Sequence, residues 1–273
     1  MATAEVIFDE VVGIHVGSLE VRLAQNDAEI DAAQALRYRI FFEEGAAVAS
    51  PDMAARRRDI DRFDSSFDHL IVIDHAIPEP DQCVVGTYRL NRASIAARTG
   101  GFYSAGEYDI RRLLRAKGEV LELGRSCVDP DYRTGSTMAL LWRGISAYVD
   151  YYDITCLFGC ASLPGTDPER LAQPLSYLHH FHLAPAAIRP RALPALYVPM
   201  NRIAREALDV RSGREALPPL IKGYLRVGGF IGDGAVIDQQ FQTTDVCVVV
   251  RVETITAKYR QHLGDGGRML GLV

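Results

Sequence analysis

Charged residues recur at intervals inside apolar segments of the first half of the chain. Arg37 precedes Phe41 and Phe42. Three further groups follow it: Asp61-Arg62-Phe63-Asp64, Gly86-Thr87-Tyr88-Arg89-Leu90 and Glu122-Leu123-Gly124-Arg125. A charge in a buried segment is destabilising unless it is paired or serves a function. Their recurrence on successive elements predicts that these side chains converge on one cleft.

Strand-like and helix-like segments alternate after an opening hairpin. Apolar or alternating runs predict strands at residues 19–23, 69–74, 83–91, 120–128, 155–160 and 246–252. Helical spacing and capping residues predict helices at residues 27–44, 108–116, 134–152, 168–182, 217–227 and 255–262. A short helix opens at Ser50-Pro51, and the four prolines between 183 and 200 predict an extended or looped segment. This order predicts an α/β fold with a mixed sheet flanked by helices.

The chain shows no clean linker, repeat or low-complexity tract, so we expect one domain. It would span residues 18–262, with a core over about 18–182 and a C-terminal elaboration over 183–262. Residues 1–17 are expected to be a flexible or amphipathic segment, and residues 263–273 a tail.

Composition excludes several classes of protein. The net charge of −5 over 273 residues argues against a general nucleic-acid binder. Five cysteines, an odd number, lie mostly in apolar runs and favour reduced, buried thiols over disulfides. Neither the cysteines nor His179, His180 and His182 complete a metal-ligand pattern, so we expect no metal. No signal peptide and no apolar run of ~18 residues is recognisable, which predicts a cytoplasmic protein.

The strand at 120–128 carries the strongest chemical signal. In a flat strand Glu122 and Arg125 would point to opposite faces, because side chains alternate. A bulge at Gly124 would redirect one of them and splay the strand from its neighbour. The alternative to a functional role for Glu122 and Arg125 is a structural ion pair at a sheet edge.

These charged segments together resemble the acyl-homoserine-lactone synthases and their relatives, acyltransferases of the GNAT-like fold. In GNAT-type enzymes the pantetheine arm of the donor enters at a splayed strand. Acetyl-CoA-dependent members follow it with a glycine-rich loop that binds pyrophosphate at a helix N-terminus. Here Arg133 and Gly135 are present, but Ser136 and Met138 stand where glycines are expected. This departure favours an acyl carrier protein (ACP), which offers one phosphodiester, over acyl-CoA.

Along most of its length, residues 20–262, the chain most resembles the bacterial ornithine N-acyltransferases. Beyond the charged groups, the resemblance includes Phe158-Gly159-Cys160-Ala161-Ser162, Leu175-Ser176-Tyr177-Leu178-His179-His180, Leu217-Pro218-Pro219-Leu220-Ile221-Lys222-Gly223-Tyr224-Leu225-Arg226 and Thr244-Asp245-Val246. The C-terminal segments separate it from the shorter autoinducer synthases. The resemblance implies transfer of a 3-hydroxyacyl chain from acyl-ACP to the α-amine of L-ornithine, giving lyso-ornithine lipid. Because that product is a lipid precursor, peripheral contact with the inner membrane face is a further expectation.

The resemblance also implies roles for individual residues. Glu122 would be the general base and Arg125 its catalytic companion. The expected substrate-binding residues are Arg37, Asp61, Asp64, Arg89, Ser162 and Tyr177. The expected acyl- or phosphopantetheine-binding residues are Ser126, Val128, Arg133, Gly135, Trp142 and Phe158. The expected docking residues for the acidic ACP are Arg111, Arg112, Arg115 and Lys117. No cofactor is expected, because the donor carries its own 4′-phosphopantetheine.

Alternatives remain at several positions. A structural network is the alternative role for Arg37, Asp61, Asp64 and Arg89. A solvated helix face is the alternative for the four expected docking residues. Cys127 and Cys160 are expected to be packing residues, with an acyl-cysteine as the alternative. Other functions compatible with the sequence are an acyl-homoserine-lactone synthase, another amino-acid N-acyltransferase, and a non-catalytic ACP- or lipid-binding protein.

Overall fold

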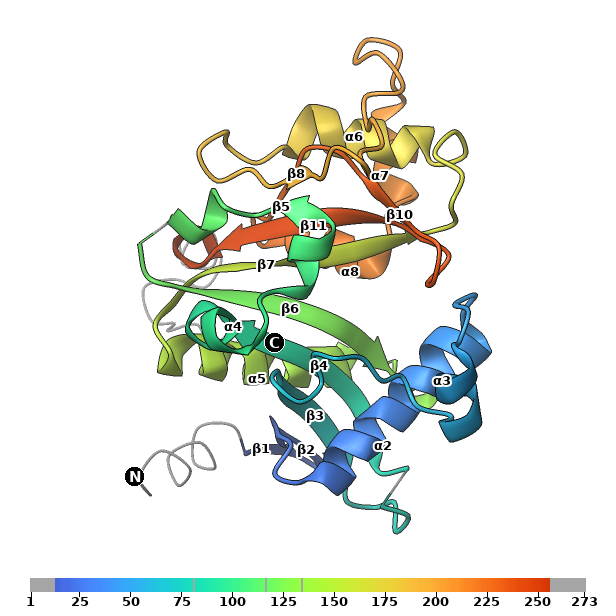
Figure 1. The fold of residues 1–273 in the computed structure, drawn as a ribbon, viewed down its shortest axis with the longest axis vertical. Coiled ribbons are helices and arrows are strands. Elements are labelled where there is room, and N and C mark those ends of the chain that lie inside the picture. The colour runs from blue at the N-terminus through green and yellow to red at the C-terminus, as the bar shows by residue number, and fades with distance from the viewer. Residues whose placement is uncertain (1–12, 81, 116, 134, 256–273) are drawn as a thin grey trace. The chain divides into compact units, whose positions relative to one another are not determined.

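The computed structural model describes residues 13–255 except 81, 116 and 134 (Figure 1). The described chain forms two compact units, each built from separate segments. The first comprises residues 13–91 and 123–154, and the second comprises residues 92–122 and 155–255. Strand β6 (Glu119–Val128) begins in the second unit and ends in the first. The predicted domain over residues 18–262, with its core and C-terminal elaboration, remains a prediction.

The sheet of the first unit is built on antiparallel pairs. Its strands are β1 (Ile14–Val16), β2 (Leu19–Leu23), β3 (Asp68–Asp74) and β4 (Val84–Arg92), with the end of β6 next to β4. The register places Ile71 opposite Thr87 and His69 opposite Arg89, and it shifts between Val72 and Ile73. His69 and Arg89 are therefore cross-strand neighbours, close enough for their side chains to share partners.

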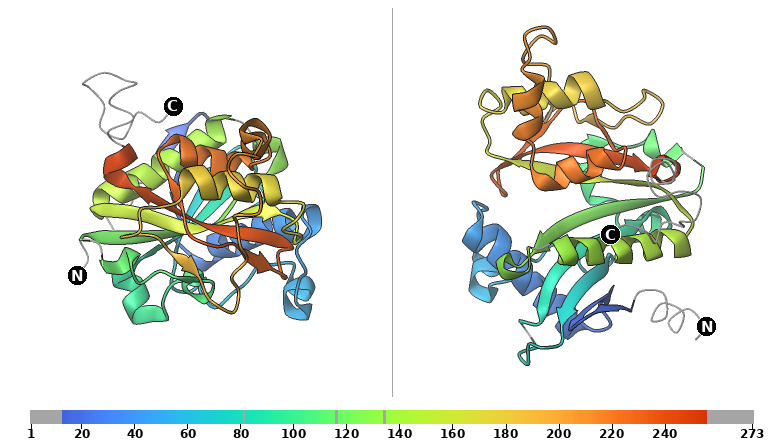
Figure 2. Two further views of the ribbon diagram at one scale, coloured as in Figure 1. Left: turned by 90° about the horizontal axis from the view of Figure 1, so that it is seen from above. Right: turned by 180° about the vertical axis from the view of Figure 1, so that it is seen from behind.

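Helices α2 (Asp27–Tyr38) and α5 (Gly135–Tyr151) cover opposite faces of this sheet (Figure 1 and Figure 2). Ile71 and Ile73 join a buried cluster with Leu36 of α2. On the other face, Leu70 approaches Gly144 of α5 so closely that an added Cβ would lie 3.0 Å from Leu70 Cδ1. Side chains of β3 thus alternate between the two helices, as the period of a strand requires.

The predicted helix starts in the first unit are confirmed. Asn26 Oδ1 accepts from the N–H of Glu29, and Ser50 Oγ accepts from the N–H of Met53 at the start of α3 (Pro51–Arg56). After Tyr38 the helix continues as a wide π-helical turn, Arg39–Glu44, so the predicted end near residue 44 is also confirmed. Side-chain oxygens at both N-caps satisfy backbone donors that the first turn leaves unpaired.

The second unit is organised on two long antiparallel strands. Strand β7 (Ile154–Pro164) pairs with β11 (Thr243–Arg251), and β11 also pairs with β10 (Val236–Asp238) and β9 (Phe230–Ile231). A small separate sheet joins β5 (Tyr108–Asp109) to β8 (Arg191–Ala192). Among the described residues its helices include α4 (Ala93–Thr99), α6 (Ala172–His182), α7 (Val210–Glu215) and α8 (Pro219–Arg226).

One face of β7 and β11 forms the core of this unit. Cys160 lies opposite Cys247, and Phe158 lies opposite Val249. Phe158 and both β11 residues belong to a buried cluster, and Cys160 packs against it from a partly buried position. Phe102, which precedes a 3-10 turn at Tyr103–Gly106, stacks edge-on against Phe158 with ring centroids 5.2 Å apart. The segment after α4 is thereby held on the strands.

Some sequence predictions are wrong. The expected helix over 108–116 is instead strand β5 followed by a 3-10 turn at Leu113–Arg115. The Asp109 carboxylate accepts from the backbone N–H and guanidinium of Arg111, a local arrangement that competes with helix formation. Within residues 1–17, which were expected to be flexible or amphipathic, Ile14–Val16 is a strand. Residues 1–12 and most of the expected final helix lie outside the described residues.

Candidate active site

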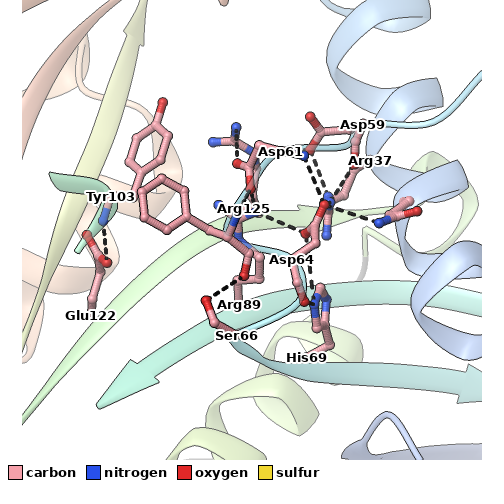
Figure 3. Close-up of polar contacts among 12 residues, drawn as sticks. Arg37, Asp59, Asp61, Asp64, Ser66, His69, Arg89, Tyr103, Glu122 and Arg125 are labelled. Atoms are coloured by element: carbon pink, nitrogen blue, oxygen red, sulfur yellow. Dashed lines mark hydrogen bonds and ion pairs between the residues drawn. The ribbon is translucent and has the colours of Figure 1, made fainter. Parts of the chain in front are cut away.

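Buried arginines and aspartates pair with one another in the first unit (Figure 3). Arg37 donates from Nε to Asp59 Oδ2 at 2.7 Å and from Nη2 to Asp64 Oδ1 at 2.8 Å. Arg89 donates from Nη1 to Asp61 Oδ1 at 2.6 Å and to Asp64 Oδ1 at 3.0 Å. Asp64 therefore joins the two arginines, as charge-assisted pairing favours.

Arg125 completes this network. Its guanidinium donates to Asp59 Oδ2 at 3.0 Å and to Asp61 Oδ2 at 3.1 Å. Its backbone is left-handed, with φ of 50°, whereas the bulge was expected one residue earlier at Gly124. A non-glycine residue in this region needs compensating contacts, and the two ion pairs of Arg125 supply them. The irregularity in β6 is thus tied directly to the network.

The fold explains why these side chains meet. Arg37 lies in the last turn of α2, and Arg89 lies on β4 opposite His69. The loop after α3 presents the three aspartates, and its turn is closed by the N–H of Phe63 donating to Asp61 Oδ1. His69 Nε2 contacts the backbone oxygen of Asp64 at 2.9 Å, so β3 also anchors this loop.

Burial and charge set the protonation states within the network. Burial by itself would raise the pKa of Asp64, but the positive charges of Arg37 and Arg89 outweigh it and lower that pKa to about 2. Burial lowers the pKa of His69 to about 4, and nearby Arg37 adds to this effect. At neutral pH Asp64 is therefore ionised and His69 is neutral.

The low exposure of the network favours a structural role for most of its members. The side chains of Arg37, Arg89 and Asp64 are 0%, 1% and 8% exposed. Asp61 and Arg125 are more accessible, at 20% and 10%. Three arginines also balance three aspartates, as expected for a network whose charges stabilise one another. Substrate contacts by Arg37, Asp64 and Arg89 stay predictions, and Asp61 is the member best placed to reach a bound molecule.

Glu122 belongs to the second unit and contacts a different segment. Its carboxylate accepts from the N–H of Tyr103 at 2.9 Å and from the N–H of Ser104 at 2.6 Å (Figure 3). These donors open the 3-10 turn at Tyr103–Gly106, and Glu122 is 1% exposed. Glu122 therefore fixes this turn, and any proton it takes must be received by a remaining lone pair.

A second acidic group lies in the same unit. Glu107 Oε2 is 3.2 Å from Cys160 Sγ, and its carboxylate lies within 4.8 Å of the carboxylates of Asp238 and Asp245. Burial raises the pKa of the Cys160 thiol well above its usual value, and the charge of Glu107 adds to this effect. A thiol held protonated is a poor nucleophile, which favours packing over an acyl-cysteine at Cys160.

The other expected substrate-binding and acyl-binding residues differ in accessibility. Phe158 is 2% exposed and lies within the core, and Tyr177 is 9% exposed on α6. Ser162 is exposed and lies opposite Asp245 in the β7–β11 register. Trp142 is half-buried on α5. Core burial of Phe158 favours a packing role over an acyl-chain wall.

The expected phosphate-binding segment begins where β6 ends. Val128 is buried and Ser126 is half-buried, while Gly135 is exposed at the first position of α5. Arg133 forms two hydrogen bonds to the Glu44 carboxylate, at 2.5 and 2.6 Å, and both side chains are 44% exposed. A donor phosphate that used Arg133 would have to compete with Glu44.

The four expected docking residues are all exposed. Arg111 is paired with Asp109, and Arg112 donates to the backbone oxygen of Ala186 at 2.9 Å. Arg115 ends the 3-10 turn, and Lys117 follows it. These residues lie on a turn rather than on one face of a helix, so they do not form a helical stripe.

Several residues of these groups were missed in the sequence. Asp59 and Glu44 are separated from Arg37 and Arg133 by 22 and 89 positions. Glu107 directly precedes the helix predicted at residues 108–116, and nothing in that pattern marked it as a site residue. Asp245 directly precedes the strand predicted at 246–252, and in the structure it lies within β11, where a buried acid requires a partner.

The geometry can be compared with known proteins. Residues 36–143 match the GNAT acetyltransferase domain family. The chain is 48% identical to the L-ornithine N(alpha)-acyltransferase of Rhizobium meliloti (strain 1021) over 263 residues, which are 95% of this chain and 88% of that protein. It is also 48% identical to the L-ornithine N(alpha)-acyltransferase of Brucella abortus (strain 2308), over 94% of this chain and 92% of that protein. The structure resembles that of FeeM, an N-acyl amino acid synthase from uncultured soil microbes, with a TM-score of 0.52, 10% identity and coverage of 90% and 98%.

The chain is thus an acyltransferase with the GNAT fold, a mixed sheet flanked by helices. Both the fold class and the enzyme class predicted from the sequence are confirmed. Within this class, the chain belongs to the L-ornithine N(alpha)-acyltransferase family, because the high identity extends across both compact units.

Proposed function

We propose that this enzyme transfers a 3-hydroxyacyl chain from acyl-ACP to the α-amine of L-ornithine, giving lyso-ornithine lipid. The observation that carries this proposal is the 48% identity to an L-ornithine N(alpha)-acyltransferase over 95% of the chain. Such identity over nearly all of both proteins supports a shared reaction as well as a shared fold.

The donor is proposed to be ACP rather than coenzyme A. Ser136 and Met138 occupy positions where a pyrophosphate loop would have glycines, and Arg133 is already paired with Glu44. The exposed start of α5 at Gly135 can still receive one phosphodiester through its backbone N–H groups. Exposed Arg111, Arg112, Arg115 and Lys117 would steer an acidic carrier protein to the enzyme.

The reaction needs a base and an oxyanion donor. The neutral α-amine attacks the thioester carbonyl, the C–N bond forms, the C–S bond breaks, and the sulfur leaves on ACP as a thiolate. The thiolate becomes a thiol by taking up the proton that the amine has given to the base. The amine proton passes to a base, for which we propose Glu122, directly or through a water. Glu107 is the competing assignment, because this residue is half-buried whereas Glu122 is 1% exposed. A backbone N–H near Ser126 to Val128, close to the left-handed turn at Arg125, would stabilise the oxyanion.

Selection of ornithine requires an acid for its side-chain ammonium. Asp61 is proposed for this role, because 20% of its side chain is exposed within an otherwise buried network. Arg89 and Arg125, both paired with Asp61, would position it. L-Norvaline has the ornithine carbon skeleton without the side-chain ammonium, so it separates recognition of that charge from recognition of the α-amino acid.

Membrane contact is proposed to be peripheral. Among the described residues, no helix combines the length and apolar character needed to cross a bilayer. The proposed product is a lipid with one acyl chain, which would partition into the membrane after release. Contact with the inner face of the membrane would shorten that transfer.

The test is an acylation assay with purified enzyme, 3-hydroxyacyl-ACP and ornithine, norvaline, lysine, glutamine or S-adenosylmethionine. Free thiol and product mass are both followed. We expect acylated ornithine from the wild type, and a large loss of kcat in Glu122→Gln with Glu107→Gln as the matched comparison. If kcat falls in Glu107→Gln but not in Glu122→Gln, Glu107 is the general base. Binding of ACP without any acylated amine would refute the proposed reaction, and a lactone from S-adenosylmethionine would favour an acyl-homoserine-lactone synthase.

The acceptor assignment is tested in the same assay. Asp61→Asn should reduce the ornithine-to-norvaline ratio of kcat/KM by on the order of tenfold or more, because a charged hydrogen bond is worth roughly 1.5–3 kcal/mol. An unchanged ratio would exclude Asp61 from recognition of the side-chain ammonium, even if overall activity falls.

A further inference from the structure

Two histidines and a glutamate meet at the edge of the first unit, apart from the network around Arg37. Glu20 Oε1 lies 3.4 Å from His15 Nε2, and Glu20 Oε2 lies 2.8 Å from His75 Nε2. The two imidazole rings are stacked with centroids 6.1 Å apart and an interplanar angle of 25°. The two imidazole nitrogens and a Glu20 oxygen all lie within 4.8 Å of one another.

The backbone places these three side chains together. His15 on β1 and Glu20 on β2 are directly paired in the antiparallel register. His75 follows the last residue of β3, and its backbone N–H donates to the oxygen of Ser18 at 2.9 Å. Gly17, with φ of 64°, makes the turn between β1 and β2. Three adjacent segments, seen next to one another in Figure 1, therefore each contribute one potential ligand.

We propose that His15, Glu20 and His75 bind one divalent transition-metal ion, with Zn²⁺ as the best-matched ion. Zinc takes imidazole nitrogen and carboxylate oxygen at about 2.0–2.2 Å, so two ligand atoms of a tetrahedral site lie about 3.3 Å apart. Each histidine faces a different oxygen of Glu20, at 3.4 and 2.8 Å, and one ligand atom from each of the three residues lies within 4.8 Å of the others. Rotation of the two exposed rings toward one Glu20 oxygen would bring the three ligand atoms to the tetrahedral spacing. Two imidazoles and one carboxylate are a known ligand set for zinc, and they leave a fourth position for water.

The exposure of the ligands suits binding from solution. The side chains of His15 and His75 are 61% and 53% exposed, so their rings can turn toward an ion without disturbing the core. Glu20 is only 12% exposed and is held in place. Arg22 Nε lies 3.4 Å from Glu20 Oε2, but its terminal nitrogens both bond to Glu29 at 2.7 Å. The guanidinium is therefore engaged mainly by Glu29.

An ion at this position would add a further connection between the three segments. Strand β1 has only three residues and pairs with β2. An ion bound by the folded unit but not by the unfolded chain stabilises the fold in proportion to the logarithm of its concentration over its Kd. Zinc should therefore raise the midpoint of thermal unfolding. No local motif in the sequence indicates this site, because His75 is 55 positions from Glu20.

The test uses the purified full-length enzyme without a histidine tag. Zn²⁺ is titrated by calorimetry, and Co²⁺ binding is followed by the visible absorption of tetrahedral cobalt. We expect one ion per chain, loss of this binding in His15→Ala/His75→Ala, and weaker binding in Glu20→Gln. His179→Ala, which alters a histidine of the other unit, is the matched control and should bind as the wild type does.

Metal binding is read out without the acylation assay, so its result does not depend on the proposed reaction. Zinc-dependent thermal stabilisation that disappears in the double variant but persists in His179→Ala would support the site. Absence of one-to-one binding by the wild type would overturn it. So would binding that is unchanged in a double variant whose circular dichroism shows it to be folded.

Discussion

Asp64 offers a direct test of the buried network, because it joins Arg37 and Arg89. Asp64→Asn preserves the size of the side chain and removes its charge. Both guanidinium groups then lose a charged partner in a site where the Arg37 and Arg89 side chains are 0% and 1% exposed. We expect the variant to unfold at lower denaturant concentration than the wild type at neutral pH.

The expected magnitude follows from the pKa and from the burial of the partners. Burial alone would raise the pKa of Asp64, yet Arg37 and Arg89 lower it from 3.8 to about 2. At about 1.36 kcal/mol per pH unit, this difference corresponds to roughly 2 kcal/mol. Removing one partner of a buried ion pair typically costs about 3–5 kcal/mol, so we expect a loss between about 2 and 5 kcal/mol.

The same pKa sets the pH dependence. Because the pKa of Asp64 is lower in the folded than in the unfolded state, its stabilisation is fully present above about pH 4. It is lost as the pH falls through about 2. The difference in unfolding free energy between the wild type and Asp64→Asn should therefore be constant near neutrality and should shrink below about pH 4.

The assay is urea unfolding followed by circular dichroism between neutral pH and about pH 3. Asp52→Asn is the matched control, since Asp52 is 68% exposed and pairs with Arg56 one helical turn away. It should change stability by no more than about 0.5 kcal/mol. The reasoning fails if Asp64→Asn matches this control, or if its effect is the same at every pH.

Other substitutions test separate features of the enzyme. Glu44→Gln should release Arg133 and lower KM for acyl-ACP several-fold, whereas Arg133→Gln should raise it; unchanged KM values in both would remove Arg133 from the donor site. Cys160→Ala should keep kcat within about twofold because the thiol is held protonated, and an acyl-thioester trapped on the wild type but absent from the variant would contradict this. Gly144→Ala should destabilise the protein by about 1–3 kcal/mol in thermal unfolding, because the added Cβ would lie 2.9 Å from the nearest side-chain atom. Gly135→Ala is the control and should be close to neutral, because nothing lies within 4 Å of its added Cβ.

Much of the fold was predictable because the relevant forces act over a few residues. The apolar run at 69–74, the turn after it and the returning strand define the β3–β4 hairpin. Asn26 and Ser50 mark helix starts through hydrogen bonds that span only three positions. The helix predicted at 108–116 was wrong because the Asp109 side chain accepts a hydrogen bond from the backbone N–H of Arg111, which gives the backbone an alternative to a helix.

The candidate site was less predictable from the sequence. Its charges were recognised as unusual, but a list of arginines and aspartates does not say which ones pair. The structure pairs Arg37 with Asp59, which had not been singled out. It also gives Arg125 a left-handed backbone, one residue after the position where a bulge was expected. These pairings turn four predicted substrate-binding residues into members of a largely buried network, of which Asp61 is the most accessible.

The sequence by itself determined the alternation of strands and helices, the main caps and the presence of charges that require partners. Local periodicity and capping act within a few residues, so they are visible in the sequence. Tertiary structure alone decided which charges neutralise one another, which face of β3 meets α2, and how His15, Glu20 and His75 come together. Those outcomes depend on strand register and on contacts between residues tens of positions apart, where burial and Coulomb attraction act only after the chain has folded.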